Sequence, residues 1–169
     1  MKMLTTTLLT LFTLVSLQNL AHAATSEVTW KDYKKYRDIY PGNESRKHFR
    51  ERTFKNFEKH FTKLATSLPE GLVLKIEVTN VDLAGDTHIG GINRLRIIKE
   101  LYSPQLTFSY QLLGADGAEI TSAAVELRDM NFMMGSNLRY RNDSLGYEKQ
   151  MLDDWFKESF KGRIIDKEK

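Results

Sequence analysis

The segment from Asp82 to His88 holds two carboxylates and one imidazole. Asp82, Asp86 and His88 are side chains of the types that bind a divalent cation, and a bound cation can activate water for hydrolysis. Their spacing matches neither the calcium loop that closes with a glutamate nor two histidines one helical turn apart. Asp86 also follows Gly85, which is typical of structural turns. The segment is a candidate site for a metal-binding protein or small metal-dependent hydrolase, and a structural turn is the favoured alternative.

A second group of polar side chains precedes the predicted C-terminal helix: Arg139, Tyr140, Arg141, Asn142, Asp143 and Ser144. The first turn of a helix presents free N–H groups that attract an anion, so this loop is a candidate ligand site. A helix cap formed by Asp143 or Ser144 explains the same residues without a ligand. If the protein has a ligand pocket, we expect it where this loop meets the segment from Asp82 to His88.

Met130, Met133 and Met134 lie close together in the sequence, and Met151 follows on the predicted C-terminal helix. Thioethers are soft ligands that favour Cu(I), so these methionines are a candidate copper site. Methionine also fills gaps in hydrophobic cores. Because Phe132 lies among them, packing beneath the C-terminal helix is the favoured interpretation.

Five basic side chains share one face of the predicted long helix: His48, Arg52, Lys55, Lys59 and Lys63. This stripe suits anionic lipid headgroups, lipopolysaccharide phosphates or an acidic partner, but a solvated surface helix has the same pattern and is favoured. Arg50 instead falls on the apolar side. It must extend to solvent at the start of the helix or pair with a carboxylate, for which Asp143, Asp153 and Asp154 are candidates. A structural ion pair is favoured over catalysis.

An aromatic segment precedes this helix, with basic residues between its rings: Trp30, Lys31, Tyr33, Lys34, Lys35, Tyr36, Arg37 and Tyr40. Rings that stack on sugars and cations that meet phosphates suit a glycan ligand. The favoured alternative is that the rings cover an edge of the sheet.

A helical period predicts two amphipathic helices. The first lies between Glu44 and about Thr66, and its apolar face holds Phe49, Thr53, Phe57, Phe61 and Leu64. The second runs from about Tyr147 to Phe160, and its apolar face holds Met151, Leu152 and Trp155.

A period of two residues predicts strands around residues 28–30, 72–83, 95–101, 106–112 and 119–128. A phase change at Asn80 predicts a β-bulge, and the turn at Asp116 and Gly117 predicts a hairpin. In the last strand, Ala123, Val125 and Leu127 are expected to be buried. The order of elements predicts an α+β fold: an antiparallel sheet of about four to five strands, with a long N-terminal helix and a C-terminal helix packed on one face.

The chain has 169 residues, no cysteine and a net charge of +3. Residues 1–23 read as a signal peptide with cleavage after Ala23, because an apolar stretch ends in Ala21-His22-Ala23. We therefore expect a single domain over residues 24–169, located in the periplasm and without a transmembrane segment after cleavage. The absence of cysteine excludes disulfides, thiolate catalysis and cysteine-ligated metals.

The sequence contains no Gly-x-Ser-x-Gly, no phosphate-binding glycine loop, no dinucleotide fingerprint and no His-Glu-x-x-His. No catalytic residue and no cofactor is therefore assigned, and the small charge excess argues against a nucleic-acid partner. The expected function is a non-catalytic binding or interaction module of the cell envelope, whose partner is an envelope protein or a glycan or lipid component. The alternative is the metal-dependent hydrolase at Asp82, Asp86 and His88.

Four stretches together carry a family resemblance: DIYPGNESRKHFRERTFKNFEKHF from Asp38, NVDLAGD from Asn80, GGINRLRIIKELYSPQLTFSYQLLGADG from Gly90 and RDMNFMMGSNLRYRNDSLGYEKQMLDDWFK from Arg128. They resemble the bacterial family of exported proteins catalogued as domain of unknown function 3016. The resemblance implies export to the periplasm of a Gram-negative cell. It implies no activity, substrate or catalytic residue.

Overall fold

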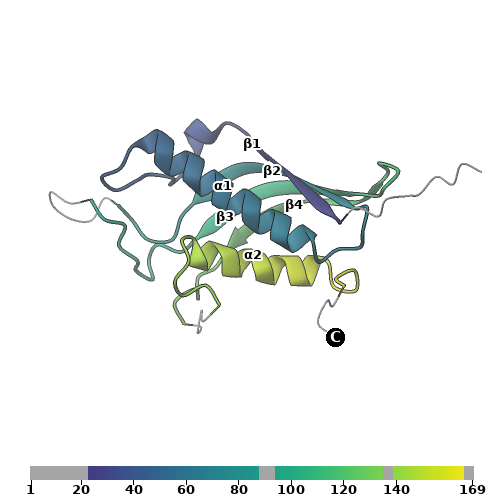
Figure 1. The fold of residues 1–169 in the computed structure, drawn as a ribbon. Helices are drawn as coiled ribbons and strands as arrows, with labels where there is room; N and C mark the ends of the chain where they lie inside the picture. Colours follow the sequence, from purple (N-terminus) through teal and green to yellow (C-terminus); the bar gives the residue numbers. More distant parts are fainter. Residues whose placement is uncertain (1–22, 88–93, 135–138, 166–169) are drawn as a thin grey trace, which may run out of the picture.

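The computed structural model describes residues 23–87, 94–134 and 139–165 of the chain (Figure 1). In chain order, its elements are β1 (Thr25–Trp30), the short 3-10 helix η1 (Tyr33–Lys35), α1 (Arg46–Ala65), β2 (Val73–Asp82), β3 (Gln105–Leu113), β4 (Glu119–Arg128) and α2 (Gly146–Ser159). The strands form one sheet in the order β1-β2-β3-β4. Figure 1 shows α1 and α2 on the same side of this sheet, which makes a two-layer α+β fold.

The sheet is mostly antiparallel, as predicted, but its first strand is not. β1 pairs with β2 in parallel, whereas β2 pairs with β3, and β3 with β4, in antiparallel directions. The prediction of a wholly antiparallel sheet is therefore wrong for β1. The physical reason is that α1 lies between β1 and β2 in the chain, and a helical crossover brings the second strand back in the direction of the first.

The segment from Leu95 to Leu101 is not a strand, although its apolar composition predicted one. Within it only Ile97 forms an isolated bridge, with Asp86. Leu95 and Leu101 are 67% and 77% exposed, so the segment does not bury an alternating apolar face. The guanidinium of Arg96 instead holds the segment by donating hydrogen bonds to backbone carbonyls of other loops. In the described residues the sheet accordingly has four strands, the lower of the two predicted numbers.

The core lies between the helices and the inner face of the sheet. α1 contributes Phe57 and Phe61, and α2 contributes Leu152 and Phe156, all of them buried. Facing them are alternate residues of the two central strands: Leu74, Ile76 and Val78 of β2, and Leu106, Phe108, Tyr110 and Leu112 of β3. Each of these large apolar side chains stabilises the fold by roughly 1.5 to 3 kcal/mol. In the described part of the chain, neither helix is long and apolar enough to span a bilayer.

The antiparallel part of the sheet confirms two local predictions and corrects a third. The register between β2 and β3 shifts between Val78 and Asn80, as the predicted bulge requires. The β3–β4 connection is a tight turn in which Gly117 adopts a φ of +78°. Ala123, however, is exposed, whereas Val125 and Leu127 are partly buried as predicted. The reason is that α2 packs over β3, leaving part of the edge strand β4 uncovered.

The aromatic segment after β1 packs between the sheet and α1. The ring of Trp30 stacks on Phe54 with a centroid distance of 3.9 Å, and its Nε1 donates a hydrogen bond to Glu58. The hydroxyl of the buried Tyr36 donates to the carbonyl of Val78 at 2.7 Å. These rings therefore close the side of the core beside β1, as the favoured structural interpretation expected.

Candidate functional site

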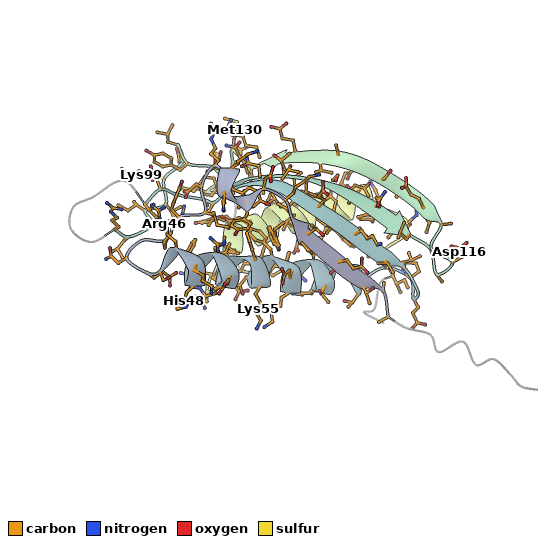
Figure 2. The ribbon with its side chains drawn as sticks, turned by 90° about the horizontal axis from the view of Figure 1, so that it is seen from above. Arg46, His48, Lys55, Lys99, Asp116 and Met130 are labelled. Atoms are coloured by element: carbon orange, nitrogen blue, oxygen red, sulfur yellow. The ribbon has the colours of Figure 1, made fainter. Side chains whose placement is uncertain are left out.

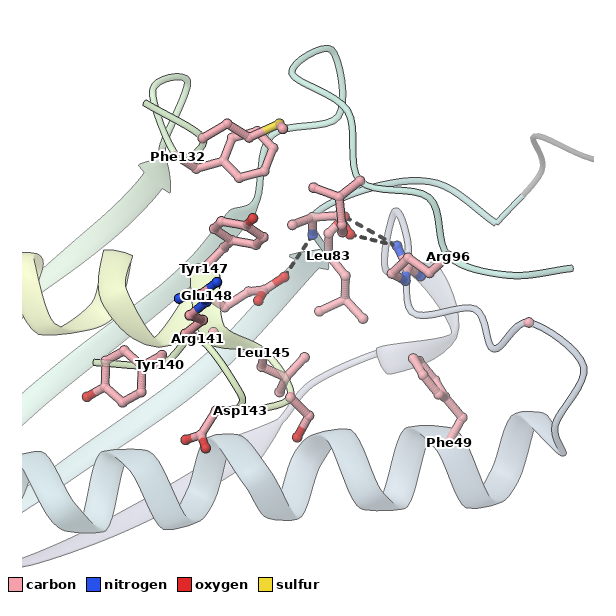
Figure 3. A pocket seen from close by; sticks show the side chains of 16 residues that line it. Phe49, Leu83, Arg96, Phe132, Tyr140, Arg141, Asp143, Leu145, Tyr147 and Glu148 are labelled. Carbon is pink, nitrogen blue, oxygen red and sulfur yellow. Dashed lines mark hydrogen bonds between the residues drawn. The ribbon is translucent and has the colours of Figure 1, made fainter. Parts of the chain in front are cut away.

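A cavity of about 560 Å³ opens at the N-terminal end of α2 (Figure 3). Four segments form it: the first turn of α1, the loop after β2, the segment after residue 94 and the loop that leads into α2. Most of its wall is apolar or aromatic, and its main apolar residues are Phe49, Leu83, Ile98, Phe132, Leu145 and Tyr147. The cavity thus combines segments that are far apart in the sequence.

The carboxyl group of Glu148 is the polar centre of this cavity. Glu148 belongs to the first turn of α2 and is only 3% exposed. Its Oε1 accepts a hydrogen bond from the backbone N–H of Ala84 at 2.7 Å, which joins α2 to the loop after β2. Burial raises the pKa of Glu148 above its ordinary value, although hydrogen bonds from backbone N–H groups and the charge of Arg96 act in the opposite direction.

Arg96 holds the loop that supplies this N–H group. Its guanidinium forms a two-pronged ion pair with Asp38, at 2.8 and 3.1 Å. It also donates hydrogen bonds to the carbonyls of Gly85 and Tyr40, both at 2.9 Å. The charge of Arg96 is balanced by Asp38. Its hydrogen bonds join the loop after β2 to the segment before α1 and so fix this part of the cavity wall.

Glycines permit the close contacts on which the cavity depends. Gly85 adopts a φ of +80°, and a Cβ atom at this position would lie 2.5 Å from the carbonyl oxygen of Ile97. At the start of α2, a Cβ on Gly146 would lie 2.7 Å from the carbonyl oxygen of Tyr140. Only glycine therefore lets these two loops approach as closely as they do.

A second buried polar cluster lies beside the cavity and joins the two helices. Asp153 of α2 accepts hydrogen bonds from the Tyr140 hydroxyl at 2.8 Å and from Arg139 at 3.0 Å. His60 of α1 approaches the other carboxylate oxygen, with Nε2 at 3.0 Å from Oδ1, but these two atoms are not aligned as a hydrogen bond. Burial alone would raise the pKa of Asp153, yet the contacts with His60 and Tyr140 and the charge of Arg139 outweigh it and lower the pKa.

The predicted site residues lie in three places: the cavity, the buried cluster around Asp153, and a separate hollow beside Asp82. Tyr140 and Arg141 line the cavity, so the loop before α2 does meet the segment after β2, at Leu83 and Ala84. Arg139 instead pairs with Asp153. Asp82 and Asp86 face a separate hollow of about 370 Å³, together with Asp38 and Arg128 among others. His88 lies outside the described residues.

Asp82 and Asp86 have protein partners where the metal hypothesis required free ligands. Asp82 accepts a hydrogen bond from Gln105 and lies 3.6 Å from Arg37. Burial raises its pKa, against the opposing charge of Arg37. Asp86 bridges Ile97 through its backbone. Within the described ranges, no three acidic or histidine side chains are grouped so that they can hold a metal ion.

Among the described residues, Arg50 forms no ion pair with any of the three acidic residues considered for it, Asp143, Asp153 and Asp154. Its guanidinium lies over the ring of Tyr33, with CZ 4.4 Å from the ring centroid. Asp153 is held by His60, Tyr140 and Arg139, as described above. Arg50 is partly exposed and thus combines a cation–π contact with access to solvent.

The basic residues of α1 are exposed along its outer face: His48, Arg52, Lys55, Lys59 and Lys63. Figure 2 shows His48 and Lys55 directed away from the sheet. Glu44 forms a two-pronged ion pair with Arg52, so one cation of the stripe is neutralised. This arrangement is that of a solvated helix face.

The methionines do not pack beneath α2, contrary to the favoured prediction. Met130, Met133 and Met134 are exposed, the last by 82%, whereas Met151 is buried in the core. Phe132 alone of this stretch turns inward, where it packs edge-on against Tyr147 at a centroid distance of 4.8 Å. The buried Met151 therefore does not join the other three as a ligand.

Sequence reasoning missed Glu148, Arg96 and His60 as polar centres and named Asp153 only as a possible partner of Arg50, although the pattern held a signal for Glu148 and His60. Glu148 precedes Met151 and Leu152 by three and four residues, and so falls on the apolar face of α2. His60 likewise follows Phe57 by three residues. A charged or polar residue in phase with an apolar stripe is a sign of a buried polar site. Arg96 had no comparable signal, because its partners come from distant loops.

A family model described as Protein of unknown function (DUF3016) matches residues 24–158, most of the chain. No curated protein and no solved structure shows significant similarity to it. The matched range starts one residue before β1 and ends in the last turn of α2, so it contains every strand, both helices and the cavity. The chain therefore belongs to the family of proteins of unknown function DUF3016.

Proposed function

We propose that the protein is a non-catalytic binding module of the cell envelope, and that its ligand occupies the cavity at the N-terminal end of α2. The observation that carries this proposal is a cavity of about 560 Å³ whose largely apolar wall surrounds one buried carboxyl group, Glu148. Small-molecule sites typically measure about 300 to 1,000 Å³ and combine apolar walls with a few placed polar groups.

The polar groups that line the described part of the wall can hold a ligand, but they do not form the nucleophile–base pair that covalent catalysis uses. A nucleophile needs a base within hydrogen-bond reach. Ser144 is the hydroxyl closest to that role, but its Oγ is hydrogen-bonded with the side-chain amide of Asn56 at 3.1 Å. No histidine belongs to the described part of the wall, and Arg96 is neutralised by Asp38. Binding is therefore the function that fits these residues.

Location in the periplasm is part of the proposal. It is supported by the apolar stretch that ends at Ala23 and by the position of the folded domain behind it. Ala24 is buried, β1 begins at Thr25, and the family match begins at residue 24. Cell fractionation followed by mass measurement tests this point. We expect the protein in the osmotic-shock fraction with the mass of residues 24–169, and recovery of the full-length chain from the cytoplasm would refute it.

Binding is tested with the uncharged fluorescent probe N-phenyl-1-naphthylamine and with native mass spectrometry. The Ser144→Trp variant fills the cavity from its exposed rim, and Asn142→Trp adds the same ring two residues away, at an exposed residue that is not part of the wall. We expect the wild-type protein and Asn142→Trp to bind one probe molecule, and Ser144→Trp to lose most of the binding. Equal binding by both variants, or no binding by the wild type, would overturn the proposal.

A further inference from the structure

We infer that the cavity selects organic cations, namely ligands that join an ammonium group to an apolar body, and that Glu148 is the residue that recognises the ammonium group. This inference rests on the proposed binding function and names the chemical class of its ligand. Three observations support it: the carboxyl group is buried and forms no ion pair, aromatic rings line the same wall, and the neighbouring cations are paired with other carboxylates.

The carboxyl group of Glu148 is buried, and the nearby positive charges of Arg96 and Lys149 do not contact it directly. In the part of the chain that the structure describes, its side chain accepts the N–H group of Ala84 and forms no ion pair. A carboxylate has about four sites for hydrogen-bond donors, so backbone N–H groups leave capacity for a ligand. A buried carboxylate that lacks a cation is costly, and a cationic ligand removes that cost when it binds.

The cations nearest to Glu148 are held by other carboxylates. Arg96 pairs with Asp38, with its Nη1 2.8 Å from Oδ2. Lys149 pairs with Asp143 at 3.1 Å. Arg141, at the exposed rim, is the remaining basic residue of the wall. The two paired cations are thus already balanced, and among the described residues neither they nor the exposed Arg141 form an ion pair with Glu148.

The walls suit the rest of such a ligand. Tyr147 and Phe132 form an edge-on pair next to Glu148, and Phe49 closes the opposite side (Figure 3). Aromatic faces attract an ammonium group through their quadrupole while they also bury the apolar chain attached to it. A carboxylate in a wall that also holds aromatic rings favours an ammonium group over a hydroxyl or a carboxylate of the same size.

Three eight-carbon compounds with different head groups test the inference: octylammonium, 1-octanol and octanoate, whose alkyl chain is one methylene shorter. Each is titrated, below its micelle concentration, against the wild-type protein loaded with N-phenyl-1-naphthylamine. We expect octylammonium to displace the probe at least about tenfold more effectively than 1-octanol, a difference of about 1.4 kcal/mol, and octanoate to be the weakest. Equal displacement by the three compounds, or strongest displacement by octanoate, would refute the inference.

The role of Glu148 is tested by Glu148→Gln, which retains the shape and the acceptor for Ala84 but removes the charge. The variant should bind the probe as the wild type does and lose the preference for octylammonium over 1-octanol. The matched control is Glu126→Gln, at an exposed position on β4, and it should keep that preference. A preference that survives in Glu148→Gln would overturn the assignment. Failure of the wild type to bind the probe would instead overturn the proposed function, so the two failures are distinct.

Discussion

Glu148 combines burial with an ionisable group, and its effect on stability should therefore depend on pH. Its pKa is raised in the folded protein, so its contribution to stability is fully present below its ordinary pKa of 4.5 and is lost as the pH rises through the higher folded value. Above its ordinary pKa the buried group accordingly costs stability in the absence of a ligand. A cationic ligand that pairs with the carboxylate would remove this cost, and the free energy so recovered would favour its binding.

We expect Glu148→Gln to unfold at a higher urea concentration than the wild type at pH 7, by about 1 kcal/mol, because the amide carries no charge into the cavity. At pH 4 the difference should largely disappear, since the wild-type carboxyl is then protonated. Urea unfolding at the two pH values measures both effects. The prediction would be contradicted if the variant had a lower free energy of unfolding than the wild type by the same amount at pH 7 and at pH 4. Other contacts would then stabilise the carboxylate.

Asp153 behaves in the opposite way, because its pKa is lowered by its partners. Its contribution is present above the ordinary pKa of 3.8 and is lost as the pH falls through the lower folded value. Asp153→Ala should reduce the free energy of unfolding at pH 7 by about 3 kcal/mol, because His60 and Tyr140 lose their buried partner. The loss should shrink as the pH falls below the ordinary pKa of 3.8. Denaturant unfolding across this range provides the measurement.

The neighbouring residue supplies the control for this experiment. Asp154 is exposed and accepts a hydrogen bond from Gln150 of its own helix, at 3.0 Å. Asp154→Ala should therefore change the free energy of unfolding by less than about 0.5 kcal/mol. Equal effects of the two substitutions would mean that the buried cluster does not hold α1 to α2.

At the scale of the elements, Gly85 and Gly117 separate two effects of replacing glycine by alanine: a steric clash of the new Cβ atom and the strain of a left-handed backbone. Both adopt a φ near +80°, but a Cβ on Gly85 would lie 2.5 Å from Ile97 O, whereas a Cβ on Gly117 would meet nothing within 4 Å. Gly117→Ala should cost about 1 kcal/mol, the price of the left-handed backbone alone. Gly85→Ala should cost roughly twice as much or more, and should also weaken probe binding, because it displaces the loop that holds Ala84. Thermal unfolding and probe titration of both variants check this, and equal losses would contradict it.

The elements themselves were predictable wherever their signal is local. Spacing of the phenylalanines identified α1, alternation identified β2 and β3, and the phase change at Asn80 identified the bulge. Prediction failed where a distant partner decides the outcome. The direction of β1 depends on the crossover through α1, and the segment from Leu95 to Leu101 is shaped by Arg96, whose partners lie more than ten residues away in the chain.

The candidate site was predictable only in its position. The loop before α2 and the segment after β2 were expected to meet, and they form two walls of the cavity. The side chains of interest were not identified, because Asp82 and Asp86 carry stronger chemical signals in the sequence than Glu148 does. Burial decides which carboxyl group has a strongly altered environment. The burial of Glu148 depends on residues far apart in the sequence, among them Phe132, Tyr147 and the loop after β2.

At the scale of the whole molecule, β1 should be essential although it is short and lies at the edge of the sheet. It places Val28 and Trp30 against the core and seats Trp30 on Phe54. A chain that begins at Ala24 should unfold cooperatively, with the same denaturation midpoint as the purified protein. A chain that begins at Lys31 should lose several kcal/mol and show no cooperative transition, because one side of the core is open. Circular dichroism during urea unfolding compares the two, and a cooperative transition in the shorter chain would contradict the expectation.

The contacts that close the cavity join residues that are far apart in the chain. The Ala84–Glu148 hydrogen bond spans 64 residues, and the contact between Asp38 and Arg96 spans 58. We expect contacts of such long range to form after the β3–β4 hairpin, because the intervening chain must first be ordered. An incompletely folded chain therefore lacks the cavity, which exists only once the complete tertiary structure has been reached.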